Sequence, residues 1–306
     1  MFRRWRETVL MLMGAVWCGL APAAWAGPPA QKLPSAYLVF PLIDLTGGRD
    51  TRIELVNLSG TSQTLECFYI DGDSCNETGF LISFTPYQPL SWLASDGLSN
   101  TQNGSAVPPF PGAQGELKCV VVPALPDLSF HNTMQGRAIV YDTNGETVSY
   151  GAVAFQRLSD GDFTGTVALN GSSYAQCPDK LHFEVLSDQP TSSSDLVLVP
   201  CAENLLLQIP TTVGVQYIIF NEFETQYSAS KSFSCFDRRA LADITAQLNR
   251  ATLGSDTAHI VARGTNGPIL GLVVDRVPGA RTAGNEPSFQ GGRSANVIFP
   301  PVADVP

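Results

Sequence analysis

Alternating apolar and polar residues recur along most of the chain and predict β-strands. Two stretches share one pattern, ELVNLSGTSQTLECF at 54–68 and YIIFNEFETQYSASKSFSCF at 217–236. Both alternate up to a turn, then resume the alternation and end just after a cysteine. Each follows a strand that ends in proline, and each precedes an Asn-Gly signal typical of a tight hairpin. These shared landmarks predict an internal duplication.

Strands at regular intervals, with many Gly and Pro turns, predict an all-β protein. We expect two tandem immunoglobulin-like β-sandwich domains at 35–158 and 172–280, joined by a linker at 159–171. The segment 281–306 lacks sustained alternation and is expected to be a poorly ordered tail.

Between its landmarks, each half carries its own addition. Helical spacing of Leu241, Ile244, Leu248 and Leu253 predicts at most one short helix, in the second domain. The first half instead has a long Gly-, Pro- and Ser-rich loop after Trp92, a candidate functional loop because connections of this length are uncommon.

The N-terminal segment predicts export. A basic start with Arg3, Arg4 and Arg6 precedes an apolar run and the cleavage pattern Ala24-Trp25-Ala26, so 1–26 is expected to be a signal peptide. No later apolar run has the roughly 18 residues needed to span a bilayer. The mature chain is therefore expected to lack a transmembrane anchor and to be periplasmic, cell-surface or extracellular.

Six cysteines follow the predicted signal peptide, and an even number in an exported chain indicates disulfides. Cys177 and Cys201 lie just outside two strands, 181–186 and 196–199, which we interpret as one hairpin; they are predicted to pair. The partners of the other four remain open: Cys67, Cys75, Cys119 and Cys235.

The charge balance narrows the classes of partner. A net charge of −10 with few lysines disfavours binding to nucleic acid and to anionic membranes. Apolar residues make up 44% of the chain, which is enough to bury a core and argues against disorder.

Several motifs together resemble a group of uncharacterised exported bacterial proteins. They are D-T-x-I-x-L-x-N at 50–57, C-F-Y at 67–69, G-E-L-K-C at 115–119 and F-N-E-F-E at 220–224. The resemblance covers most of the mature chain. It implies a bacterial envelope or extracellular setting and an immunoglobulin-like sandwich, and it implies no activity.

Candidate chemistry is sparse. No G-x-S-x-G elbow occurs, and of the three histidines only His131 lies in a loop with polar neighbours. Asp71 and Asp73 have oxygen ligands of the type that calcium prefers, although Asp-Gly-Asp is also ordinary turn chemistry, which we favour. No metal or other cofactor is expected.

Aromatic side chains suggest a ligand-binding platform. Tyr87, Trp92 and Phe110 flank the long loop and could bind a sugar or a peptide, although aromatic residues at strand ends more often belong to a core. Asn57 and Asn221 recur at the same landmark and are expected to bond the backbone of the turns that follow them.

The sequence thus favours an exported, non-catalytic module that binds or scaffolds another envelope or extracellular protein or glycan. The alternatives are a carbohydrate-binding module and, less favoured, a hydrolase acting on envelope glycan.

Overall fold

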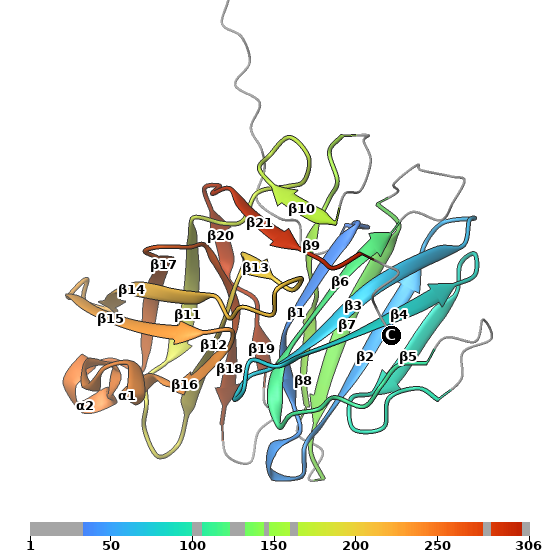
Figure 1. Ribbon diagram of the computed structural model, residues 1–306. Coiled ribbons are helices and arrows are strands. Elements are labelled where there is room, and N and C mark those ends of the chain that lie inside the picture. Colours follow the sequence, from blue (N-terminus) through green and yellow to red (C-terminus); the bar gives the residue numbers. More distant parts are fainter. Residues whose placement is uncertain are drawn as a thin grey trace, which may run out of the picture.

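The computed structural model describes residues 33–99, 106–122, 132–143, 147–159, 165–277 and 283–301. The predicted signal peptide and His131 lie outside these ranges. Nearly all regular structure in them is β-strand, distributed over five sheets (Figure 1).

The first and second sheets come from the N-terminal half. The first has the order β4 (Glu77–Phe84), β3 (Gln63–Asp71), β6 (Gln114–Val122), β1 (Tyr37–Asp44) and β9 (Val153–Phe155). The second has the order β5 (Pro89–Leu93), β2 (Asp50–Asn57), β7 (Met134–Tyr141) and β8 (Thr147–Gly151).

The third and fourth sheets come from the C-terminal half. The third has the order β15 (Gln226–Ser234), β14 (Thr212–Asn221), β17 (Thr257–Gly264), β11 (Lys180–Leu186) and β20 (Ser288–Gln290). The fourth has the order β16 (Asp237–Ala240), β12 (Ser193–Pro200), β18 (Ile269–Arg276) and β19 (Ala283–Asn285).

The fifth sheet is small and joins segments that are distant in sequence. Its order is β10 (Thr166–Leu169), β21 (Ala295–Ile298) and β13 (Glu203–Asn204), with β13 parallel to β21. The stretch predicted to be a linker therefore pairs with the stretch predicted to be a poorly ordered tail. That tail also supplies β19 and β20 to the fourth and third sheets.

The prediction of two tandem immunoglobulin-like β-sandwiches is wrong. The strands form five separate sheets, arranged as a five-blade β-propeller. The first and second sheets draw their strands alternately from the chain, so a sheet is not a run of consecutive strands. Alternation of apolar and polar residues predicts that a segment is a strand and which of its faces is buried. It does not predict which other strand that segment pairs with.

The predicted tandem repeat is also wrong, because its two copies fold differently. In the first copy, β2 and β3 belong to different sheets. In the second copy, β14 and β15 pair along their whole length as an antiparallel hairpin. The two Asn-Gly stretches also fold differently. In the first copy β7 and β8 pair with each other, whereas in the second copy β17 and β18 lie in different sheets.

The helical segment is split into single turns. It comprises α1 (Leu241–Ile244), η2 (Ala246–Leu248) and α2 (Arg250–Leu253); a further turn, η1 (Thr46–Gly48), follows β1. Thr245 and Asn249 interrupt it with extended backbone, and each side chain caps the next turn. The four residues with helical spacing are nevertheless buried, so this segment covers one end of the third sheet's core.

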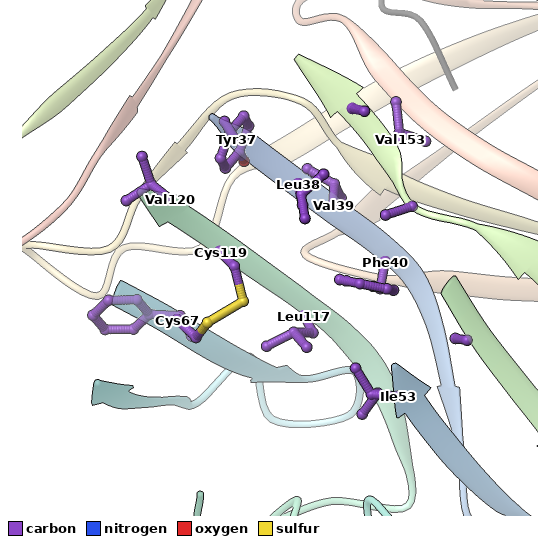
Figure 2. Packing of buried hydrophobic residues seen from close by; sticks show 14 of the residues in the cluster. Tyr37, Leu38, Val39, Phe40, Ile53, Cys67, Leu117, Cys119, Val120 and Val153 are labelled. Carbon is purple, nitrogen blue, oxygen red and sulfur yellow. A yellow bond between two sulfur atoms is a disulfide. The ribbon is translucent and has the colours of Figure 1, made fainter. Parts of the chain in front are cut away.

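The largest core runs through both halves of the chain. All eight residues of β1 are buried, and β1 contacts β2 and β7 of the second sheet as well as β12 and β18 of the fourth. Figure 2 shows β1 side chains beside Leu117 and Val120 of β6. The strand β1 is therefore covered on both faces.

Three disulfides join the chain: Cys67–Cys119, Cys75–Cys235 and Cys177–Cys201. Cys67 and Cys119 are directly opposed on β3 and β6 (Figure 2). Cys75–Cys235 ties the turn after β3 to the end of β15.

The pair predicted from sequence, Cys177–Cys201, is present, but the hairpin from which we inferred it is not. The strands β11 and β12 lie in different sheets.

Candidate functional site

A buried charged cluster lies between the first sheet and the C-terminal half. Lys118 of β6 contacts Glu116 Oε1 at 2.9 Å and the Pro200 carbonyl oxygen at 3.2 Å, and it also binds Glu203 of β13. Glu116 and Lys118 share one face of β6 because they are two residues apart on a strand. The three charged side chains are at most 1% exposed.

Burial sets the ionisation of this cluster. It raises the pKa of Glu116 to about 8, an effect that Lys118 opposes and that the Glu203 carboxylate reinforces. Burial alone would lower the pKa of Lys118, but the two carboxylates outweigh it and raise that pKa above its usual value. Burial thus favours the protonated form of Glu116, whereas the neighbouring carboxylates favour the charged form of Lys118.

Two further glutamates near this region have raised pKa values. Burial raises the pKa of Glu66 to about 8, and burial followed by the Glu203 charge raises that of Glu77 to about 8. Neither carboxylate oxygen of Glu66 has a hydrogen-bond partner among the described residues. The protonated carboxyl is therefore the form that this environment favours.

A second ionic network also connects the two halves. Arg238 Nη1 lies 2.5 Å from Asp44 Oδ2, and Arg238 Nε lies 3.0 Å from Asp195 Oδ2. Burial would raise the pKa of Asp44, but Arg238 and hydrogen bonds from Thr46 outweigh it and lower the pKa. This network joins the first sheet to the fourth, and the Lys118 cluster joins the first sheet to β12 of the fourth and to β13 of the fifth.

A groove lies open to solvent on the second sheet. It has a volume of about 530 Å³ and crosses β5, β2 and β7. Its lining consists of Glu54, Leu55, Val56, Pro89, Leu90, Ser91, Gln135, Gly136 and Arg137. We call it the β5-β2-β7 groove.

Strand register explains the composition of the groove. Glu54 stands opposite Ser91 on one side and Arg137 on the other, so the three side chains share the outer face of the sheet. Arg137 Nε lies 2.5 Å from Glu54 Oε2. A Cβ atom added to Gly136 would point inward and meet Phe40 at 2.6 Å, so the sheet packs closely beneath the groove.

The predicted aromatic platform is not assembled at the surface. Trp92 is 4% exposed and donates from Nε1 to the Tyr69 hydroxyl at 2.7 Å, and Phe110 packs edge-on against Tyr69. Only Tyr87, which is 68% exposed, faces solvent; it lies two residues before Pro89 of the groove. Trp92 and Phe110 are therefore core residues.

The aspartates considered for calcium form a turn. Asp71 accepts hydrogen bonds from the backbone N–H groups of Asp73 and Ser74, as turn chemistry requires.

The asparagine prediction is confirmed. Asn57 Oδ1 accepts from Ser59 N at 3.0 Å, and Asn221 Oδ1 accepts from Phe223 N at 2.9 Å.

Sequence reasoning missed both the groove and the buried cluster. The motif GELKC does contain Glu116 and Lys118 at alternate positions, but a charged face on a strand normally indicates solvent. Their buried partner, Glu203, is distant in sequence and could not be inferred from spacing.

No protein-family model and no curated protein matches this chain. None of the helices in the described ranges has the length and apolar character needed to cross a membrane. The three disulfides fit a protein of an oxidising compartment.

Proposed function

We propose that this protein is an exported, non-catalytic binding protein that holds part of another envelope or extracellular macromolecule in the β5-β2-β7 groove. The observation that carries the proposal is the groove itself. Its volume of about 530 Å³ falls within the range of ligand-binding clefts. Apolar side chains, a carboxylate, a guanidinium and neutral polar groups converge on it, which suits a mixed polar and apolar partner.

The position of the ionisable groups with raised pKa values supports binding over catalysis. An enzyme places such groups where substrate can reach them. Here Glu66 and Glu116 are 0% exposed, and Glu77, Asp237 and Asp275, whose pKa values burial also raises, are half-buried. None of these five carboxyl groups lines the groove. The residues that line the groove include neither histidine nor cysteine.

Export is supported by two independent features. The N-terminal sequence has the organisation of a signal peptide, and three disulfides require oxidising conditions to form. We place the protein in the periplasm, at the cell surface or outside the cell. The net charge of −10 disfavours a nucleic-acid partner.

Carbohydrate binding and glycan hydrolysis are the alternatives. The carbohydrate alternative rested on an aromatic platform, and burial of Trp92 and Phe110 leaves Tyr87 as its exposed member. No observation therefore favours carbohydrate binding or glycan hydrolysis over the binding of a macromolecular partner.

The test reverses the charge that is most exposed in the groove. Arg137 is 60% exposed, so Arg137→Glu changes the groove without disturbing the core. The matched control, Glu54→Arg with Arg137→Glu, exchanges the two residues and preserves an ion pair. Wild type and both variants are captured from native cells after chemical cross-linking, and their partners are quantified by mass spectrometry.

The proposal expects a partner that the wild type captures reproducibly, that Arg137→Glu captures at a reduced level, and that the exchanged pair partly recovers. An identical set of partners for all three proteins, or no partner for any of them, would contradict the groove as the binding site.

A further inference from the structure

Two of the three histidines meet on the outer face of the third sheet. His182 and Glu184 are two residues apart on β11 and so share a face, and His259 of β17 stands directly opposite Glu184. The imidazole rings of His182 and His259 lie 5.3 Å apart between centroids. This histidine pair is far in sequence from every residue of the groove.

The inner nitrogens of the histidine pair face each other. His182 Nδ1 lies 3.2 Å from His259 Nε2. Each ring also contacts an acceptor through its outer nitrogen: His259 Nδ1 lies 2.5 Å from Glu184 Oε1, and His182 Nε2 lies 3.0 Å from Gln290 Oε1. Both rings are only partly buried, so the site is open to solvent.

These contacts favour one tautomer of each ring. The Glu184 carboxylate and the Gln290 amide oxygen accept hydrogen bonds and donate none, so each favours a proton on the outer nitrogen of the ring it contacts. In a neutral imidazole, the inner nitrogen then carries a lone pair. In this tautomer the two lone pairs lie 3.2 Å apart, and they repel unless a proton or a metal cation binds to both.

We propose that His182 and His259 bind a divalent transition-metal ion such as Zn²⁺. Two nitrogens that each lie 2.0–2.1 Å from a tetrahedral zinc ion are separated by about 3.3 Å, which matches the spacing observed here. Glu184 and Gln290 act as outer partners, since metal-binding histidines usually donate their second N–H group to a carboxylate or a carbonyl oxygen.

The site supplies two protein ligands, and water or a donor atom from a partner fills the remaining coordination positions of the metal ion. Within the described ranges, no group of three or more His, Cys, Asp or Glu side chains is arranged to hold a metal ion. Imidazole ligands favour Zn²⁺, Cu²⁺ and Ni²⁺ over Ca²⁺ and Mg²⁺, which prefer oxygen.

The test is isothermal titration calorimetry of the disulfide-bonded protein with ZnCl₂ at pH 7.5, using a protein without a polyhistidine tag. We expect one saturable site in the wild type. His182→Gln or His259→Gln should weaken zinc binding by at least about tenfold, and Glu184→Gln by about 10- to 100-fold. The matched control is His131→Gln, which changes the third histidine and should leave the affinity unchanged.

Gln290→Glu separates this proposal from an ordinary hydrogen bond between the rings. A carboxylate at 290 fixes the proton on His182 Nε2, so it should tighten zinc binding. The proposal is overturned if the wild type shows no saturable binding, if the His182 and His259 variants bind as tightly as the wild type, or if Gln290→Glu weakens binding. If the wild type shows no saturable zinc binding, a proton shared by His182 Nδ1 and His259 Nε2 occupies the space between the two rings.

Discussion

Lys118 offers the most direct test of how the two halves are held together. Lys118→Met removes the ammonium group and leaves Glu116 and Glu203 facing each other without a counter-charge. All three side chains are at most 1% exposed, so water cannot replace the lost partner. Removing one member of a buried ion pair typically costs about 3–5 kcal/mol, a large share of the roughly 5–15 kcal/mol stability of a folded protein.

Urea denaturation under oxidising conditions measures this loss. Trp92 is the one tryptophan after residue 26, and it is buried, so its fluorescence reports on the core. With a slope of about 3 kcal/mol per molar urea for a protein of this size, we expect the midpoint to fall by about 1–1.7 M.

A triple variant distinguishes lost charge balance from lost packing. Lys118→Met with Glu116→Gln and Glu203→Gln removes every formal charge from the cluster, and it should recover more than half of the stability that the single variant loses. A loss below about 1 kcal/mol in the single variant would refute this reasoning, and so would a triple variant no more stable than the single one.

Three further predictions concern stability measured by the same assay. Burial raises the pKa of Glu66 from 4.5 to about 8, so the stability that its protonated carboxyl contributes is fully present below pH 4.5 and is lost as the pH rises towards 8. Glu66→Gln should remove that part of the pH dependence of stability, and parallel pH profiles of the wild type and the variant would contradict this assignment. The Cys75–Cys235 disulfide spans 160 residues, so replacing both cysteines with serine should cost up to about 5 kcal/mol, whereas an unchanged midpoint would show that the ion networks suffice. Asn57 is 0% exposed and donates to the Thr85 carbonyl oxygen at 3.0 Å, so Asn57→Ala should cost about 1–3 kcal/mol, and a loss within 0.5 kcal/mol would contradict its role.

The all-β character and many strand positions could be predicted from the sequence, because alternation shows directly which residues face a core. Sheet membership could not. The stretches 138–155 and 259–275 carry the same Asn-Gly signal, yet β7 and β8 pair while β17 and β18 enter different sheets. For β17 and β18, pairing with distant strands such as β14 and β12 outweighs the local turn preference.

The candidate site illustrates a similar limit. Trp92 was a candidate for a surface platform, with a core position as the alternative that strand-end aromatic residues more often adopt. Its burial depends on Tyr69 of another sheet, which provides the hydrogen-bond acceptor. The burial of Lys118 depends on Glu203, which lies 85 positions away in the sequence and neutralises the ammonium group. Both outcomes depend on contacts between distant segments, which spacing along the chain does not encode.

The measurement that tests the central claim most directly is site-specific photo-cross-linking from the groove in native cells. A photoreactive amino acid replaces Ser91, an exposed residue of the groove, and in a control it replaces Ser228, an exposed residue on β15 of the third sheet. The account predicts a defined adduct with another macromolecule from position 91 and none from position 228. Absence of an adduct at 91, or the same adducts from both positions, would contradict a binding function for the β5-β2-β7 groove.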